Sequence, residues 1–362
     1  MQQTVEQNRA LLVDGPASVC VVSGKAEMFG YELKQAVKIV VREGKRLPFF
    51  VLEKAVFDVS LGPNASIAEV EGSTIPDSWN KPLEAILSVQ KKPAVVLLLG
   101  TIDSGKSSYC TYLVNKLVDG KCRVALLDGD LGQSDIGPSG TVGYAIISKP
   151  VTQLHNLKLQ NAFFVGITSP ISAIDKTIEG LAAMKAEILQ RQVDFVVVNT
   201  DGWVTGDIAV SYKTQLINAL KPDVIVGVQT DNELRSIIAY LDNIPVILVE
   251  ASSSLSPRSA EKRKILREMT YARYLKNPKL HCYPISQMTI EPRKALPKIQ
   301  EPEKGLLVGL YGSENKFLGI GVLREINRMR KALKVQTAIS AKPKRLVFGK
   351  VLLNEKLQEI QD

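Results

Sequence analysis

A short motif that directly follows an apolar run constrains this chain more than any other feature. The motif is Gly100-Thr-Ile-Asp-Ser-Gly-Lys-Ser107, and the apolar run covers residues 94–99. It matches the pattern G-x-x-x-x-G-K-[S/T], in which glycines let the backbone curl so that successive N–H groups point at phosphate oxygens. A helical pattern over residues 106–119 follows, and the start of a helix adds partial positive charge. Strand, loop and helix predict a triphosphate site, with Lys106 on the outer phosphates and the Ser107 hydroxyl on Mg²⁺.

Composition places the chain among globular proteins. Its 362 residues allow two or three domains, and 45% of them are hydrophobic and 23% charged. The apolar runs are too short to span a bilayer, and the N-terminal residues lack the order of a secretory signal. We therefore expect no membrane partner and a cytoplasmic location, or a nuclear one in a eukaryote. Four cysteines without C-x-x-C pairing argue against a zinc site, and the net charge of +9 favours an anionic partner.

Apolar runs alternate with helical patterns between residues 81 and 277. Continuous apolar runs are typical of strands buried on both faces of a sheet. Strand–helix–strand order implies right-handed crossovers and parallel pairing. We therefore predict an α/β fold, in which a P-loop NTPase-type parallel sheet is flanked by helices. The expected strands cover residues 95–99, 123–127, 162–165, 195–198, 224–228 and 245–249.

Smaller β-rich domains are expected before and after this sheet in the sequence. Residues 1–80 predict a small sandwich or barrel, with a turn at 24–30, and residues 278–362 regain strand character. Nine Lys or Arg residues lie between Arg324 and Lys350, against one acid, which fits either a solvated face or a nucleic-acid surface. The expected outer strands cover residues 18–22, 37–41, 49–52, 56–59, 306–311, 317–323 and 346–352.

Polar side chains follow three of the central strands, at the edge where parallel sheets bind ligands. Asp128 and Asp130 follow the second strand, and a carboxylate there can hold Mg²⁺ or accept a proton from an attacking hydroxyl. Thr168 and Ser169 follow the third, where hydroxyls can bind phosphate, although a helix N-cap explains them equally well. Trp203 follows the fourth, where it can stack on a base or cover the sheet edge.

A basic helix is expected over residues 257–276, with Ser259 as its N-cap and Pro278 beyond its end. Arg263 and Arg267 lie one turn apart on one face of this helix. Guanidinium groups on a mobile segment can neutralise the charge that develops during phosphoryl transfer. A surface helix with paired charges is the structural alternative.

Taken in order, these motifs resemble the polynucleotide 5′-hydroxyl kinases of RNA processing. That family includes the kinase subunit of the pre-mRNA cleavage factor and tRNA-splicing machinery, relatives in ribosomal-RNA processing, and archaeal-type members. The resemblance covers nearly the whole chain. Its motifs are G-x-A-E-x-F-G at 24–30, the phosphate loop, D-x-G-Q at 130–133, T-x-P at 168–170, N-T-x-G-W at 199–203, R-S-x-x-x-R-x-x-x-R at 258–267 and F-L-G-x-G at 317–321.

The resemblance implies a central kinase domain at 81–277, with a basic lid helix at about 258–276, between an N-terminal domain at 1–80 and a C-terminal domain at 278–362. ATP and Mg²⁺ would be the cofactors, and RNA or DNA 5′-hydroxyl ends and RNA-processing proteins the partners. The implied catalytic residues are Lys106, Asp130, Arg263 and Arg267. The implied ATP-binding residues are Gly100, Thr101, Ile102, Asp103, Ser104, Gly105, Lys106, Ser107 and Ser108. Implied metal ligands are Ser107 and Asp130, with Asp128 as a further candidate. The implied substrate-binding residues are Gln133, Thr168, Ser169 and Trp203.

Two other functions remain open on the sequence alone. A non-catalytic ATP-binding scaffold would use the nucleotide only to fix a partner-binding conformation. A small-molecule kinase or partition-type ATPase would need neither the basic C-terminal domain nor a base-stacking tryptophan. A small GTPase is disfavoured, because Asn115-Lys116 and Asn315-Lys316 lack the aspartate of a guanine-reading N-K-x-D segment.

Overall fold

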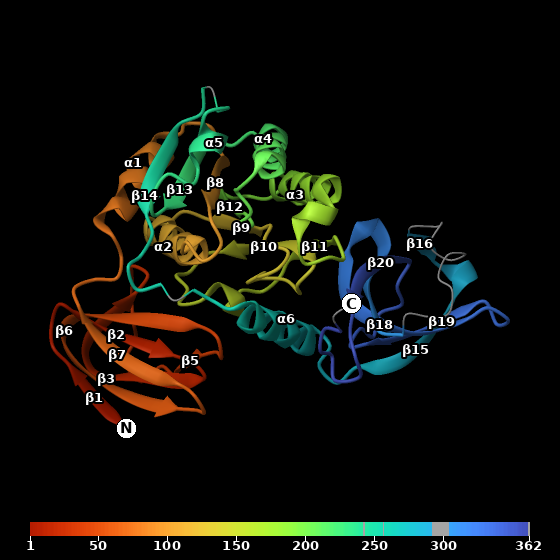
Figure 1. Ribbon diagram of the computed structural model, residues 1–362, viewed down its shortest axis with the longest axis horizontal. Helices are drawn as coiled ribbons and strands as arrows, with labels where there is room; N and C mark the ends of the chain where they lie inside the picture. Colours follow the sequence, from red (N-terminus) through yellow and green to blue (C-terminus); the bar gives the residue numbers. More distant parts are fainter. Residues whose placement is uncertain (242, 256, 292–303, 361–362) are drawn as a thin grey trace. The chain divides into compact units, whose positions relative to one another are not determined.

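The structure, a computed structural model, describes residues 1–241, 243–255, 257–291 and 304–360. Within these residues the strands form three sheets, which follow one another along the chain (Figure 1). The fold divides into two compact units. Unit 1 comprises Met1–Leu126, Ile146–Leu157 and Ile188–Arg263, and unit 2 comprises Leu127–Ala145, Lys158–Glu187 and Lys264–Asp362. The domain boundaries expected after residues 80 and 277 stay predictions.

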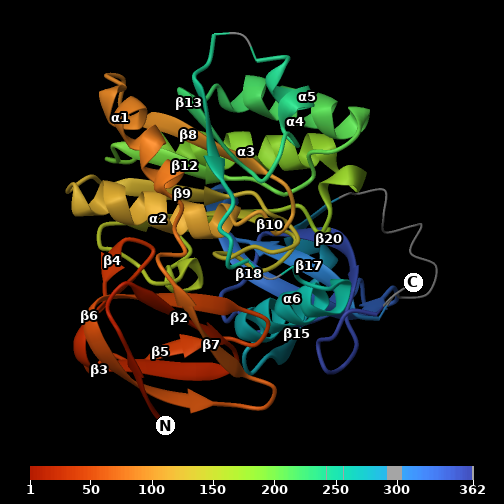
Figure 2. The ribbon, with the colours of Figure 1, turned by 60° about the vertical axis from the view of Figure 1, so that its left-hand side comes forward.

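The N-terminal sheet forms the β-rich region expected before the phosphate loop (Figure 2). Its strand order is β4-β3-β6-β2-β7, and β1 and β5 pair with β6 and β3. Alternate residues of β3 and β6 point into a core that includes an edge-to-face contact of Phe49 with Phe57. The strands are β1 Gln2–Val5, β2 Arg9–Asp14, β3 Ala17–Met28, β4 Tyr31–Glu32, β5 Ile39–Val41, β6 Arg46–Leu61 and β7 Ser66–Glu71.

Two expectations for this sheet were wrong. The apolar runs at 49–52 and 56–59 belong to one strand, β6, because the charged residues between them remain extended and Glu53 pairs with Lys25 of β3. The segment 24–30 is not mainly a turn, because β3 continues to Met28 through register shifts. The chain turns only at Phe29 and Gly30, where φ is 49° and 70°.

The central sheet has the P-loop NTPase-type α/β arrangement that the sequence predicts. Its strand order is β11-β10-β9-β12-β8-β13-β14, and β12 and β13 pair in parallel with β8. β8, β9 and β12 are buried at every position, as a sheet covered on both faces requires. The strands are β8 Ala94–Gly100, β9 Val124–Asp128, β10 Thr141–Ile147, β11 Asn161–Phe164, β12 Phe195–Asn199, β13 Val224–Gln229 and β14 Val246–Glu250. The helices are α1 Lys81–Ser88, α2 Lys106–Asp119, α3 Ile174–Ile188, α4 Asp207–Leu220 and α5 Arg235–Ile238.

Strand β10 was not expected, and it pairs antiparallel with β11, so the sheet is mixed rather than wholly parallel. Its sequence includes Gly143, a residue that weakens strand signals. A Cβ at Gly143 would lie 2.8 Å from a methyl carbon of Leu159, so close packing explains the glycine.

The C-terminal sheet has the strand order β15-β19-β18-β17-β20-β16 and apolar residues on both faces. Leu307 and Ile320 pack with Tyr271 of the helix α6, whereas Val308 and Leu333 belong to a separate cluster. The elements are α6 Ala260–Tyr274, β15 Lys279–Pro284, β16 Thr289–Glu291, β17 Leu306–Tyr311, β18 Phe317–Asn327, β19 Ala332–Thr337 and β20 Arg345–Leu352. Short 3₁₀ turns occupy Asp77–Asn80, Leu154–Asn156, Pro170–Ser172, Ile285–Gln287 and Ser313–Asn315. In the described part of the chain, no helix has the length and apolar character needed to cross a membrane.

Candidate functional site

The phosphate loop joins β8 to α2, and α2 has the predicted bounds, Lys106–Asp119. Asp103 and Gly105 have φ values of 59° and 90°, which give the loop its curl. A Cβ at Gly100 would lie 2.4 Å from the carbonyl oxygen of Val228, so only glycine fits where the strand enters the loop. The loop therefore has the backbone form that turns consecutive N–H groups toward an anion.

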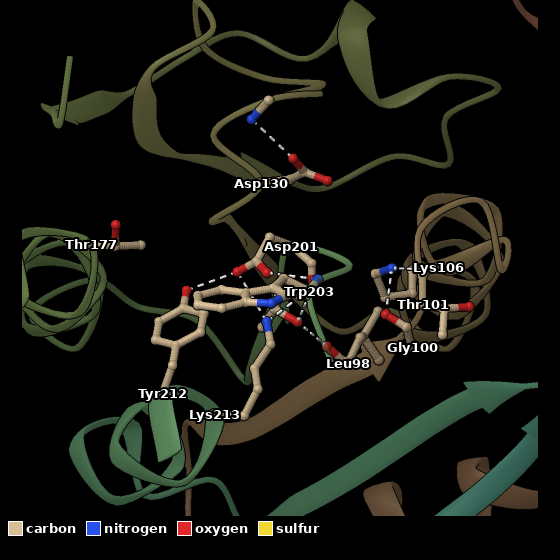
Figure 3. Close-up of polar contacts among 12 residues, drawn as sticks. Leu98, Gly100, Thr101, Lys106, Asp130, Thr177, Asp201, Trp203, Tyr212 and Lys213 are labelled. Atoms are coloured by element: carbon tan, nitrogen blue, oxygen red, sulfur yellow. Dashed lines mark hydrogen bonds and ion pairs between the residues drawn. The ribbon is translucent and has the colours of Figure 1, made fainter. Parts of the chain in front are cut away.

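Lys106 and Ser104 supply polar groups inside this loop. The Lys106 side chain is only 7% exposed, and its Nζ donates to the carbonyl oxygens of Gly100 and Thr101 at 2.8 and 2.6 Å (Figure 3). Ser104 is buried, and its Oγ has no hydrogen-bond partner among the described residues. A buried ammonium and a buried hydroxyl without a partner fit a loop that binds phosphate oxygens.

The N-T-x-G-W segment, which follows β12, lies directly against the phosphate loop. Thr200 Oγ1 donates to the carbonyl oxygen of Leu98 in β8 at 2.8 Å. A Cβ at Gly202 would lie 2.5 Å from the backbone nitrogen of Ile102, so the two loops touch at this glycine. The structure thus brings Trp203 and the phosphate loop, both predicted from the sequence, into one part of unit 1.

A buried ion pair holds the Trp203 loop in place. Lys213 is 0% exposed and Asp201 5% exposed, and Lys213 Nζ lies 3.0 Å from Asp201 Oδ2. Figure 3 shows Tyr212 and Lys213 pointing from α4 toward Asp201, whose carboxylate also accepts from the Tyr212 hydroxyl and the Trp203 backbone N–H. The Trp203 ring stacks on Tyr212, with centroids 5.7 Å apart and planes at 26°. The indole is therefore oriented by a buried polar network.

Sequence reasoning missed Asp201, Tyr212 and Lys213. The signal for Lys213 was its spacing, because it occupies a core-facing position of α4 between Ala209 and Leu216. A charged residue at a core position is a sign of a specific partner.

Two arginines of the R-S-x-x-x-R-x-x-x-R segment contact the phosphate loop. Asp103 accepts from the Arg258 backbone N–H at 3.0 Å and from Arg258 Nε at 2.8 Å. Arg263 Nη1 lies 3.2 Å from Asp103 Oδ2, the oxygen that also accepts from the Arg258 backbone N–H. The helix α6 begins at Ala260, after the expected N-cap Ser259, whose Oγ accepts from the Lys262 backbone N–H.

Arg267, the third arginine of that segment, is held within unit 2. Its Nε and Nη2 donate to both carboxylate oxygens of Glu359, at 2.7 and 2.5 Å. The Tyr271 hydroxyl donates to the same carboxylate at 3.1 Å. Burial, and then the nearby Glu359 charge, raise the pKa of Tyr271 well above its usual value. The helix ends at Tyr274, two residues earlier than expected.

The two candidate acids of unit 2 have different surroundings. Asp128 is 1% exposed, and its Oδ2 accepts from Ser134 Oγ at 3.0 Å and from the Asp135 backbone N–H at 2.7 Å. Asp130 is half-buried, and its Oδ1 accepts from the backbone N–H groups of Gly132 and Gln133. Asp128 thus organises the loop after β9, and Asp130 lies nearer the surface in a tight turn.

The D-x-G-Q turn and the T-x-P segment also lie together in unit 2. A Cβ at Gly132 would lie 2.9 Å from the carbonyl oxygen of Thr168. Gln133 Nε2 donates to the Gly132 carbonyl at 2.7 Å. Ser169 is exposed and precedes the 3₁₀ turn Pro170–Ser172, but its side chain makes no capping hydrogen bond. In the described residues, no cluster of three or more His, Cys, Asp or Glu side chains could bind a metal ion.

Residues 100–277 match the family described as the P-loop of the mRNA cleavage and polyadenylation factor CLP1. A polyribonucleotide 5′-hydroxyl-kinase of Methanocaldococcus jannaschii is 32% identical over 240 residues, which are 66% of each protein. Another, of Pyrococcus furiosus, is 24% identical over 339 residues, which cover 79% of this chain and 95% of that protein. The match thus spans just under two thirds of the first relative's length and almost all of the second.

Solved structures show the same fold. A chain from a Clp1p–Pcf11p complex superposes with a TM-score of 0.77 over 97% of both chains, at 14% identity. A second structure, of an extended Pcf11p–Clp1p interface, gives a TM-score of 0.75 at 15% identity, over 97% of this chain and 98% of that one. The shared architecture therefore includes the outer β-rich parts as well as the central sheet.

Proposed function

Because residues 100–277 match the CLP1 P-loop family, we propose that this chain is an ATP-dependent polynucleotide 5′-hydroxyl kinase. It transfers the γ-phosphate of ATP to the 5′-hydroxyl end of RNA or DNA during RNA processing. The observation that carries this proposal is the phosphate loop, with its buried Lys106 and a Ser104 hydroxyl that has no partner among the described residues. The names of the two archaeal relatives, polyribonucleotide 5′-hydroxyl-kinases, support RNA as the acceptor.

The reaction is an in-line phosphoryl transfer. The 5′-hydroxyl oxygen bonds to the γ-phosphorus while the bond to the β,γ-bridging oxygen breaks, and ADP leaves. Lys106 and the backbone N–H groups of the loop bind the donor phosphates. Ser107 would help to hold Mg²⁺, which neutralises phosphate charge when bound. Asp130 accepts the hydroxyl proton, whereas Asp128, with three donors from residues 134–136 on one oxygen, serves the loop.

The residues proposed to bind the acceptor strand are those that the sequence analysis assigned to it. Trp203, held on Tyr212, stacks on a base near the 5′ end, an interaction worth about 1–3 kcal/mol. Gln133, Thr168 and Ser169 contact the sugar–phosphate groups. Arg263 and Arg267 neutralise charge on the transferred phosphoryl and the leaving phosphate. Further RNA-processing proteins are proposed as partners, since a relative was solved with Pcf11p.

The test is transfer of labelled γ-phosphate to 5′-hydroxyl RNA and DNA oligomers, with and without Mg²⁺. We expect transfer that requires Mg²⁺ and that falls by a factor on the order of 10²–10³ in Lys106→Ala and in Arg267→Ala. Lys34→Ala, which removes an exposed lysine from the loop after β4, is the control and should keep full activity.

Two outcomes would overturn the proposal. ATP that stays bound through purification, with no transfer to any oligomer, would identify a non-catalytic scaffold. Competition by mononucleosides but not by oligomers would identify a small-molecule kinase. A third outcome, unchanged transfer in both the Lys106 and Arg267 variants, would contradict the proposed mechanism.

A further inference from the structure

A carboxylate lies within the phosphate loop itself, and two arginines cover it. Asp103 is 12% exposed, with Arg258 Nη2 at 2.7 Å from Oδ1 and Arg263 Nη1 at 3.2 Å from Oδ2. The Arg258 backbone N–H donates to Oδ2 as well, so three groups of one segment converge on a single side chain. All of these contacts lie within unit 1.

The segment that carries these arginines is also fixed to the loop by packing. A Cβ at Gly105 would lie 3.2 Å from a methyl carbon of Leu255, so this side chain covers the last residue of the loop. Just before it, the Ser254 carbonyl accepts from Arg46 of β6 at 3.5 Å. Ser254 and Leu255, which precede α6, therefore contact the N-terminal sheet and the phosphate loop, respectively.

An acid at this position is electrostatically unfavourable for the proposed ligand. A triphosphate bound by the loop would lie close to the Asp103 charge, and like charges at short range repel strongly when they are partly shielded from water. Arg258 and Arg263 remove this penalty, because their charges outweigh that of the one carboxylate. The Asp103 carboxylate in turn limits where the two guanidinium groups lie.

We propose that Asp103 is a positioning residue, which fixes Arg258 and Arg263 at the phosphate loop so that both neutralise its charge and Arg263 faces the nucleotide phosphates. The inference rests on the proposed ATP site but not on transfer to an acceptor. It assigns the Asp103 side chain a role distinct from that of the loop backbone. It also gives Arg258 a role through Asp103 rather than through direct contact with ATP.

Equilibrium binding of ATP to the full chain tests this role without any transfer step. We expect Arg258→Ala to weaken ATP binding by about tenfold, because the Asp103 charge is then less balanced. Asp103→Asn alone should change ATP affinity by less than about threefold. The Asp103→Asn, Arg258→Ala double variant should recover at least about fivefold of the loss, which is the coupling typical of residues in one ion-pair network.

Matched controls carry the same charge changes elsewhere in unit 1. Asp119→Asn lies at the far end of α2, about 20 Å along the helix from the loop. Arg9→Ala removes an arginine that pairs with Glu69 on the N-terminal sheet. Neither should change ATP affinity, and adding Asp119→Asn to Arg258→Ala should not restore binding.

A kinetic measurement separates positioning from stability. Asp103→Asn should lower kcat by about tenfold with little change in KM for ATP, because Arg263 loses its ion pair with Asp103. Arg258→Lys keeps the charge but loses the paired hydrogen bonds, so it should retain ATP affinity and lose kcat. Additive losses in the double variant, or unchanged kcat in both Asp103→Asn and Arg258→Lys, would overturn the proposal. If the wild type binds ATP but transfers no phosphate, the kinase proposal fails while the binding cycle still decides the role of Asp103.

Discussion

Gly202 sets how closely two loops of the candidate site approach each other. Any other residue would place a Cβ 2.5–2.7 Å from the backbone of Ile102, which would displace the phosphate loop. The N-T-x-G-W pattern directed attention to Trp203, because an aromatic ring just past the end of a strand can stack on a base. The pattern gave no sign of the glycine's contact, because it depends on how β8 and β12 pair in the sheet.

The Asp201–Lys213 pair shows a second limit of sequence reasoning at this scale. The spacing of Lys213 on α4 indicates burial, but the sequence does not reveal which acid it meets. Here the partner follows β12, and the pair fixes a loop rather than adding to an apolar core. Buried ion pairs contribute little to stability compared with apolar residues, but breaking one leaves a costly buried charge.

Replacement of Lys213 by methionine tests this role. Lys213→Met leaves the buried Asp201 carboxylate without its cation, and we expect a loss of about 3–5 kcal/mol in the free energy of unfolding. Urea denaturation at pH 7 measures the loss. The Asp201→Asn, Lys213→Met double variant should lose less than Lys213→Met alone. A loss below about 1 kcal/mol in the single variant would contradict a buried charge pair.

At the scale of elements, the most regular patterns were predicted best. Helix α2 has the expected bounds, and each of the six central strands expected from continuous apolar runs is present within one or two residues. Strand β6 was divided in two, because its solvent-facing charges interrupt the apolar pattern while the backbone pairing continues. Strand β10 was missed, because its antiparallel pairing with β11 lacks the helix that signals a parallel crossover.

One cross-strand pair of the N-terminal sheet, where β2 ends and β6 begins, is charged and has a defined pH dependence. Asp14 at the end of β2 faces Arg46 of β6 and accepts from its Nη2 at 2.7 Å and from its Nε at 3.0 Å. The hydrogen bond from Arg46 holds the pKa of Asp14 below its usual value, and a hydrogen bond from Ser66 lowers it further. Since the depressed pKa belongs to the folded state, this carboxylate stabilises the fold when it is ionised.

The sign of that linkage gives the pH window. The contribution of Asp14 to the free energy of unfolding is fully present above the pKa of about 3.9 that an aspartate has in the unfolded chain. It is lost as the pH falls through the lower pKa of Asp14 in the folded state. We therefore expect Asp14→Asn to be less stable than the wild type at pH 7, and the difference to shrink below about pH 4. Urea midpoints at pH 7, 4 and 3 measure this. Arg46→Gln should reduce the same pH dependence. A stability difference between Asp14→Asn and the wild type that grows on acidification would contradict the lowered pKa of Asp14.

At the scale of the whole molecule, the predicted site residues belong to both compact units. The phosphate loop, Trp203 and Arg263 lie in unit 1, whereas Asp130, Thr168 and Arg267 lie in unit 2. The sequence singled out these residues because each belongs to a motif of the family that the chain resembles. Their contacts within each unit could not be predicted, because they depend on packing between distant segments. Their joint action in one reaction stays a prediction.

Three basic residues lie close together in a turn of the C-terminal sheet. Between β18 and β19, Arg328, Arg330 and Lys331 surround Met329, which is 96% exposed. A basic turn with an apolar tip fits contact with the backbone and bases of a nucleic acid. If this turn contacts phosphates, the affinity for nucleic acid should fall as the salt concentration rises.

Charge reversal in this turn tests its contribution to acceptor binding. Arg330→Glu with Lys331→Glu should weaken binding of a 5′-hydroxyl RNA oligomer. The slope of the logarithm of the binding constant against the logarithm of the salt concentration should fall in magnitude by about one for each phosphate that the turn no longer neutralises. ATP affinity should not change. Lys34→Glu with Lys38→Glu, exposed lysines of the N-terminal region, is the control. Equal RNA affinity and equal slope in the two double variants would exclude the turn from the binding surface.

The carboxylate of Asp103 and the guanidinium groups of Arg258 and Arg263 make two distant stretches of the chain depend on each other's identity. A natural substitution that removed the acid would deprive both guanidinium groups of the Asp103 charge, and loss of Arg258 would leave the acid less well balanced. Substitutions at Asp103 in the loop and at the arginines near the start of α6 are therefore expected to occur together among related sequences. The two motifs, although far apart in the gene, would be inherited as one unit of selection.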